Sequence, residues 1–222
     1  MTDATSAQTQ TLEQTLNKTD FGHVLFENRK VFFGFLIAIM VGALGFVFWK
    51  QSQQSAALKH SEEVFKFQNE TWTNAKAGKM TPAELVTSFK KLDSNIQSSP
   101  IMVPVALDMG KFLFEKGAFN EAEEILSNVN TKNDTLNFFV GLQRAVLLEK
   151  MNNVDGAIAV LEKLNSVKDG LMPQKVSLDL GRLYLAKGEK AKAQSQFETV
   201  INTYPNDEQA KVAKLYLSQL AQ

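Results

Sequence analysis

Residues 180–205 read LGRLYLAKGEKAKAQSQFETVINTYP, and this stretch decides the fold. Apolar residues recur at helical spacing on both sides of Gly188, and Pro205 closes the second run. Gly181 is followed by Tyr184 after three residues, by Ala193 after twelve and by Phe197 four residues further on. The stretch therefore predicts two helices joined by a turn at Gly188.

The same spacing occurs twice more upstream. The first copy has Gly110, Leu113, Gly117, Phe119, Ala122 and Leu126, and the weaker middle copy has Ala145, Leu148, Val154, Ala157 and Leu161. The first residues of the three copies, at 110, 145 and 181, are 35 and 36 residues apart. This spacing and these residue types resemble the tetratricopeptide (TPR) pattern, whose repeat is about 34 residues. We therefore expect an all-α, TPR-like α-solenoid of helical hairpins over residues 101–222, closed by a capping helix within 207–222.

Small residues explain the spacing, because only small side chains let two helices touch. We expect the small residues of each first helix to face an alanine of the second, in the pairs Gly110 with Ala122, Ala145 with Ala157, and Gly181 with Ala193. The larger Leu113, Leu148 and Tyr184 should fill the space between neighbouring hairpins.

Residues 31–49, VFFGFLIAIMVGALGFVFW, carry no charged side chain. As a helix they would span about 28 Å, close to the ~30 Å hydrocarbon core of a bilayer. A core helix would keep a polar face, and a cleaved signal peptide would have a shorter apolar run and a shorter preceding tail. We therefore expect a transmembrane helix. Cations favour the N-terminal side (Lys18, Arg29 and Lys30 before it, Lys50 and Lys59 after it), which predicts a cytoplasmic N-terminus and a C-terminal domain across the membrane.

Gly34, Ala38 and Gly42 recur every four residues and so share one face of this helix. Small residues at this spacing allow close approach of another membrane helix. The face predicts packing against a second copy or against another membrane protein.

The remaining segments are less informative. We expect a disordered tail at 1–20, a juxtamembrane segment at 21–30, and a linker helix with a degenerate hairpin at 50–100. Leu58, Phe65 and Trp72 are spaced by seven, which predicts one apolar face packed on the next helix. Thr81-Pro82-Ala83-Glu84 is a helix start with a capping box.

Composition excludes several function classes. The chain has no cysteine, and Lys+Arg and Asp+Glu both total 24, so neither thiol chemistry nor a basic nucleic-acid surface is indicated. His23 and His60 flank the apolar segment on opposite sides and cannot share a metal. No Gly-rich phosphate loop, nucleophile elbow or HExxH motif occurs. We therefore predict no catalytic residues, no metal, no cofactor and no enzymatic activity.

Binding is the remaining function class. The first helix of each TPR hairpin lines a concave surface, so the resemblance implies inward-facing residues there. Lys111, Phe114, Phe139 and Arg182 are the candidates for a partner-binding groove, since aromatic and cationic side chains suit peptide-like ligands. The aliphatic candidates beside them are Leu107, Leu142, Val146, Leu178 and Leu185.

The layout resembles the YfgM-like ancillary subunits of the SecYEG translocon. The local match is best in LFENRK (25–30) and GALGFVFWKQSQQSAA (42–57), where a Gly-rich apolar helix ends in Trp plus a cation. The resemblance implies a bacterial inner-membrane protein with a periplasmic TPR domain. It also implies a scaffold or chaperone-like subunit that binds SecYEG, exported proteins or periplasmic chaperones.

Two other functions fit the same sequence. A cytosol-facing, N-anchored TPR receptor or adaptor would need the opposite membrane orientation. A structural homo-oligomer would use the 34-38-42 face and the 50–77 helix for self-association.

Overall fold

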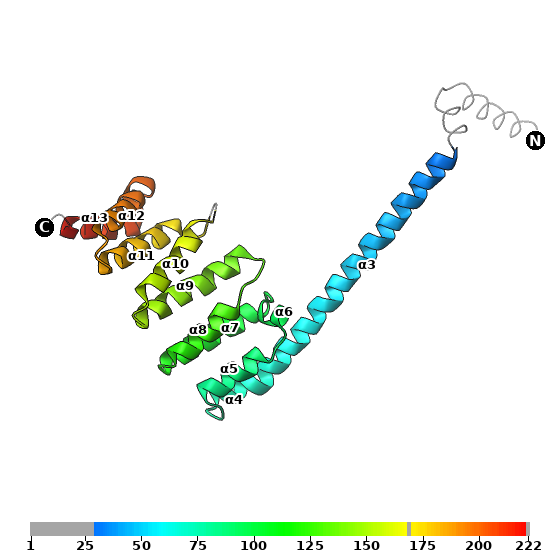
Figure 1. Ribbon diagram of the computed structural model, residues 1–222, viewed down its shortest axis with the longest axis horizontal. Helices are drawn as coiled ribbons and strands as arrows, with labels where there is room; N and C mark the ends of the chain where they lie inside the picture. The colour runs from blue at the N-terminus through cyan, green and yellow to red at the C-terminus, as the bar shows by residue number, and fades with distance from the viewer. Residues whose placement is uncertain (1–28, 168–169, 221–222) are drawn as a thin grey trace, which may run out of the picture. The chain divides into compact units, whose positions relative to one another are not determined.

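The computed structural model describes residues 29–167 and 170–220, and every element within them is helical (Figure 1). The chain divides into two compact units, 1–58 and 59–222, and helix α3 (Arg29–Phe67) contributes to both. The predicted tail at 1–20 and nearly all of the juxtamembrane segment lie outside the described residues. Each unit is taken by itself below.

The first unit consists, as far as it is described, of α3 up to residue 58. Large apolar side chains from Ile37 to Trp49 are all more than half exposed. A Cβ built on Gly34 or Gly42 would meet no atom within 4 Å, and Ala38 is exposed, so the small-residue face is open. Within the described residues, no helix is long and apolar enough to cross a membrane. The side chains of residues 31–33 and 35–36 lie outside the described set, and the transmembrane span stays a prediction.

The second unit stacks helical hairpins. Its three complete pairs are α7 (Met102–Glu115) with α8 (Phe119–Asn128), α9 (Asp134–Lys150) with α10 (Val154–Asn165), and α11 (Pro173–Ala186) with α12 (Lys190–Thr203). Helix α13 (Glu208–Leu220) then packs on α11 and α12. The predicted all-α, TPR-like α-solenoid is confirmed, and the members of each pair lie side by side in Figure 1. The role of α13 as a capping helix stays a prediction.

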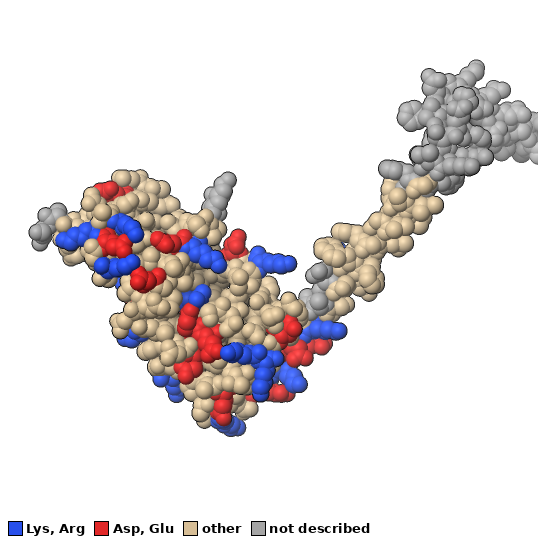
Figure 2. Space-filling model, viewed as in Figure 1, with Lys and Arg blue, Asp and Glu red and all other residues tan. Residues whose placement is uncertain are grey.

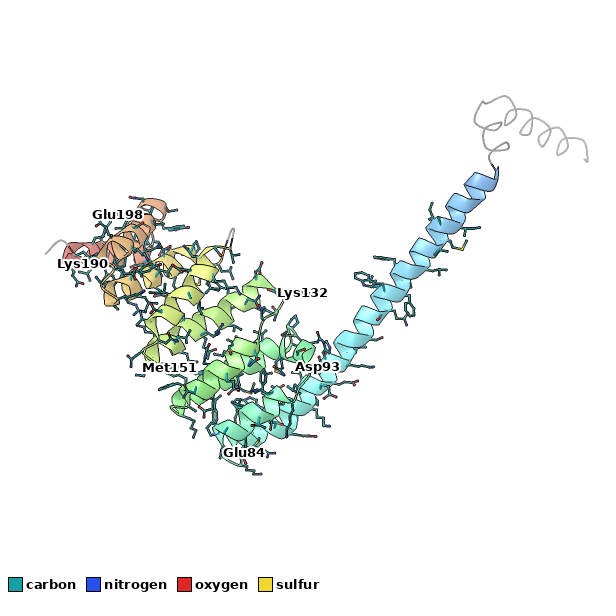
Figure 3. All side chains as sticks on the ribbon, in the orientation of Figure 1. Glu84, Asp93, Lys132, Met151, Lys190 and Glu198 are labelled. Atoms are coloured by element: carbon teal, nitrogen blue, oxygen red, sulfur yellow. The ribbon has the colours of Figure 1, made fainter. Side chains whose placement is uncertain are left out.

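The three turns within these hairpins share one backbone feature. Seven residues after the first residue of each copy, the chain adopts a positive φ, at Gly117 (74°), Asn152 (59°) and Gly188 (83°). Glycine tolerates this left-handed conformation, and asparagine is the side-chain-bearing residue that does so most readily. The middle copy therefore keeps the turn without a glycine. Met151, which is labelled in Figure 3, directly precedes Asn152 in this turn.

The close contact within the hairpins differs from the expectation. The nearest side chain to Gly110 is Leu126, and the nearest to Gly181 is Phe197, which would lie 2.9 and 2.5 Å from an added Cβ. The glycines thus make room for a large side chain of the second helix, rather than for Ala122 or Ala193. These alanines are fully buried themselves.

An additional hairpin precedes the three copies. It is formed by the end of α3, the π-helix η1 (Gln68–Trp72), α4 (Thr73–Lys76) and α5 (Pro82–Lys90), followed by α6 (Ser94–Gln97). The Thr81 capping box is confirmed: Thr81 N–H donates to Glu84 Oε2 at 2.7 Å, and Glu84 N–H donates to Thr81 Oγ1 at 3.2 Å (Glu84 is labelled in Figure 3).

The predicted Leu58-Phe65-Trp72 face is wrong. Trp72 is buried, but Phe65 and Leu58 are 67% and 66% exposed, and Val64 and Phe67 enter the core instead. The π-helix lies between Phe65 and Trp72, and its wider turn breaks the seven-residue spacing there, so Trp72 does not share the exposed face of Leu58 and Phe65.

The apolar interior of the repeat unit forms two clusters that meet at α9. Val140 and Leu147 of α9 belong to the cluster that reaches back to Val64, whereas Phe138 and Leu148 belong to the cluster that extends forward to Ala213. At the far end, Phe197 stacks on Tyr216 of α13 at 5.0 Å between ring centroids. Each hairpin therefore depends chiefly on its neighbours, as in other solenoids.

Candidate functional site

The first helices α7, α9 and α11 together line two adjoining cavities. The larger, about 170 Å³, lies between α7 and α9, and the smaller, about 40 Å³, lies between α9 and α11. Val146 of α9 lines both of them and is 57% exposed. We call these two cavities and their lining the groove.

The α7–α9 cavity is mostly apolar. Gly110 and the buried Leu126 and Leu147 line it together with Phe114 and Val146. Gly110 has to remain small here, because a Cβ would collide with Leu126. The cavity therefore owes its space to the residue that also sets the hairpin spacing.

Two polar residues complete this cavity. Lys111 stands at the rim, with its side chain 73% exposed and its Nζ 4.0 Å from Glu115 Oε1. Gln143 of α9 donates from Nε2 to the Leu107 carbonyl at 3.1 Å, and this hydrogen bond joins α9 to α7. An exposed lysine paired at that distance is held only weakly.

The α9–α11 cavity is bordered by charge. Arg182 of α11 donates two hydrogen bonds to the Glu149 carboxylate of α9, one of them 2.8 Å from Nη2 to Oε2. The hydrogen bonds from Arg182 hold the pKa of Glu149 below its ordinary value. The same hydrogen bonds to the carboxylate raise the pKa of Arg182. On α11, Lys175 Nζ lies 2.9 Å from Asp179 Oδ2. Both ion pairs are partly exposed.

Three of the four predicted groove residues line these cavities: Lys111 and Phe114 on the α7 side, and Arg182 on the α11 side. Phe139 lines neither cavity. It is 46% exposed on α9, and its ring contacts the edge of Phe138. The role of all four in binding a partner stays a prediction.

Reasoning from the sequence missed Gln143, Glu149 and Lys175. Two of these residues have a hydrogen-bond partner about one repeat away: Gln143 lies 36 residues after Leu107, and Glu149 lies 33 residues before Arg182. Trp72, which donates to Asp108 at 3.1 Å, has the same separation of 36. These three hydrogen bonds join successive first helices, whereas the Lys90–Glu124 pair, 34 residues apart, joins the second helices α5 and α8.

Another cavity, larger than these two, lies at the α8–α9 loop and the end of α10. It measures about 410 Å³ and is lined by apolar residues such as Phe138, Val160 and Leu164, with Arg144 at one side. Arg144 is engaged there by Glu123, at 2.5 Å from Nη2 to Oε1. No predicted site residue lines it.

The described residues contain no group of three or more His, Asp or Glu that could hold a metal ion. Figure 2 shows lysine, arginine, aspartate and glutamate interspersed over the visible face of the repeat unit, without a field of one sign. A basic stripe, which a nucleic-acid surface needs, is not visible on this face of the described residues.

Comparison with known proteins places the chain. The ancillary SecYEG translocon subunit of Aggregatibacter actinomycetemcomitans is 24% identical over 178 residues, which cover 78% of this chain and 80% of that protein. The resemblance to that family is thereby confirmed. The crystal structure of MamA matches 60% of this chain and 73% of its own, with 20% identity and a TM-score of 0.39. The model of the tetratricopeptide repeat-like domain matches residues 25–222, and the chain therefore belongs to the tetratricopeptide repeat-like domain family.

Proposed function

We propose that this protein is a membrane-tethered scaffold or chaperone-like subunit of the protein-export translocon. Its groove would bind exported proteins or periplasmic chaperones, and it would catalyse no reaction. The observation that carries this proposal is the match, over most of both chains, to a relative named as an ancillary SecYEG translocon subunit. A repeat domain with an open groove is suited to binding a partner chain.

The apolar helix supports the tether. From Ile37 to Trp49 every described large side chain is apolar and more than half exposed, and Phe48 reaches 78%. A continuous apolar surface of this kind is unfavourable in water and favourable in lipid. We therefore propose residues 31–49 as the membrane anchor, with the N-terminus in the cytoplasm and the repeats in the periplasm of a bacterial inner membrane.

Protease accessibility tests this orientation. An epitope at the C-terminus of the full chain should be digested when protease is added to spheroplasts, and should be protected in inverted inner-membrane vesicles. Protection in spheroplasts would instead support the cytosol-facing receptor or adaptor.

The small-residue face supports a contact with a translocon helix. Leu at Gly34 and Gly42 would fill space where an added Cβ meets no atom, and Leu at the exposed Ala38 would enlarge the same face, so a close helix neighbour would be pushed away. We expect this variant to lose co-purification with SecYEG from crosslinked membranes. A matched control replaces Met40, Ala43 and Val47 by Leu, because these positions lie on the opposite side of the helix.

The outcomes of that experiment separate the candidate functions. Loss in the first variant and retention in the control support the packing face. Retention in both would remove this face from the translocon contact. Recovery of a second copy of the chain alone, without translocon subunits, would support the self-associating structural protein instead.

A further inference from the structure

The charges of the groove are balanced within the chain. The Arg182 guanidinium is engaged by Glu149 through two hydrogen bonds, and Lys175 is engaged by Asp179. All four side chains line the α9–α11 cavity. A ligand that brought its own carboxylate would have to displace Glu149 from Arg182 and leave that carboxylate without its partner, at the cost of a partly exposed ion pair.

The α7–α9 cavity offers apolar surface instead. Phe114, Val146 and Leu147 face a space of about 170 Å³, and Val146 exposes 57% of its surface. An apolar cavity of about 150 Å³ holds a benzene ring. One aromatic or branched aliphatic side chain therefore matches the available volume.

The rim of the α7–α9 cavity attracts a charged ligand only weakly. Lys111 is the remaining cation of the groove, and Glu115 lies one helical turn away from it. Its 73% exposure leaves it well hydrated, so an ion pair with a ligand there adds little affinity.

We propose that the groove selects an internal, uncharged peptide segment that inserts one apolar side chain between α7 and α9, and that it disfavours a free C-terminal carboxylate. This inference rests on the proposed function, because it names the ligand class of the same groove. An internal segment supplies neither terminal charge, and its apolar side chain loses water on entering the cavity.

Peptide binding to the full-length chain tests the proposal. The chain is reconstituted in lipid nanodiscs, so that no detergent fills the cavity, and two short dye-labelled peptides are compared by fluorescence anisotropy. Both contain Leu-Phe-Leu. In one the sequence continues on both sides to an amidated end, and in the other it stops at the last Leu with a free carboxylate. We expect the capped peptide to bind more tightly.

Three variants locate the binding. Val146→Asp places a charge at the exposed edge of the cavity and should weaken the capped peptide about tenfold or more. Leu215→Asp, at a residue of similar exposure (59%) on α13, is the matched control and should leave binding unchanged. Glu149→Gln frees the Arg182 guanidinium and should raise the affinity for the free-carboxylate peptide about tenfold.

The results distinguish failure of this inference from failure of the groove function. The inference alone is overturned if the free-carboxylate peptide binds as tightly as the capped one and Val146→Asp weakens both. It is also overturned if the free-carboxylate peptide binds more tightly than the capped one and Lys111→Gln abolishes this difference. The proposed groove function falls, and the inference with it, if neither peptide binds or if Val146→Asp changes nothing while circular dichroism shows the variant folded.

Discussion

At the scale of single residues, Gly181 leaves less room for a Cβ than any other described glycine. The ring of Phe197 occupies the place where a Cβ would stand, and Phe197 has no exposed surface. A buried ring without free space around it cannot shift without moving its neighbours. The glycine is therefore required for steric reasons, while its φ is that of an ordinary helix.

Gly181→Ala should consequently lower the free energy of unfolding, by about 1–3 kcal/mol, as overpacking does. Urea denaturation followed by circular dichroism measures the change. In the Gly181→Ala background, Phe197→Leu should recover part of the loss, because the smaller side chain makes room for the methyl group. A single variant as stable as the parent would contradict the steric interpretation.

The Arg182–Glu149 pair gives stability a defined dependence on pH. The pKa of Glu149 is lower in the folded chain than its ordinary value of 4.5, so the pair stabilises the fold above that value. The contribution is lost as the pH falls through the lowered folded pKa. Glu149→Gln should cost up to about 1 kcal/mol at pH 7, a typical value for a partly exposed pair.

The parent and Glu149→Gln should therefore converge in stability as the carboxyl group protonates in acid. Equilibrium unfolding of both chains at a series of pH values checks this. A difference that stays constant from neutral to acidic pH would show that the glutamine substitution acts through packing instead.

At the scale of elements, features set by residues adjacent in the sequence could be predicted. Features set by packing between helices could not. The Thr81–Glu84 capping box involves neighbouring residues, and the structure forms it as predicted. The π-helix that takes Trp72 off the face of Phe65 follows the end of α3, and no sequence motif predicts it. Leu126 was recognised as a repeat position, but its place over Gly110 depends on how two helices pack.

The groove residues could be predicted from the sequence only in part. Lys111, Phe114 and Arg182 line it because the repeat assigns them to the first helices. Glu149 was missed because a single carboxylate on a helix carries no local mark, and only its pairing one repeat away distinguishes it from a solvated side chain. Phe139 lies on the correct helix, but its side chain is outside both cavities.

The turn after α9 should depend on the residue at position 152. Asn152 has a φ of 59°, so Asn152→Ala should destabilise the fold by about 1 kcal/mol, whereas Asn152→Gly should be neutral or stabilising. Thermal unfolding of the three chains provides the comparison. Equal losses for Ala and Gly would mean that the Asn152 side chain, and not its backbone, holds the turn.

At the scale of the whole molecule, the repeat unit behaves as a one-dimensional stack. Tyr216 of α13 covers Phe197 at the C-terminal end, so Tyr216→Ala should remove part of this cover and destabilise the last hairpin. Hydrogen exchange should speed up in α11 and α12 first, with α7 and α8 nearly unchanged. Leu215→Ala, at an exposed neighbour, is the control. Uniform acceleration throughout the unit would indicate a single cooperative block instead.

Helix α9 affects how the repeat unit resists a pulling force, since its side chains belong to both apolar clusters. Tension applied between residue 59 and the C-terminus would pass from one cluster to the other through this one helix. The two clusters could not separate from each other at α9 without bringing buried groups of this helix into water. In an optical trap the repeats next to α9 should thus rupture together.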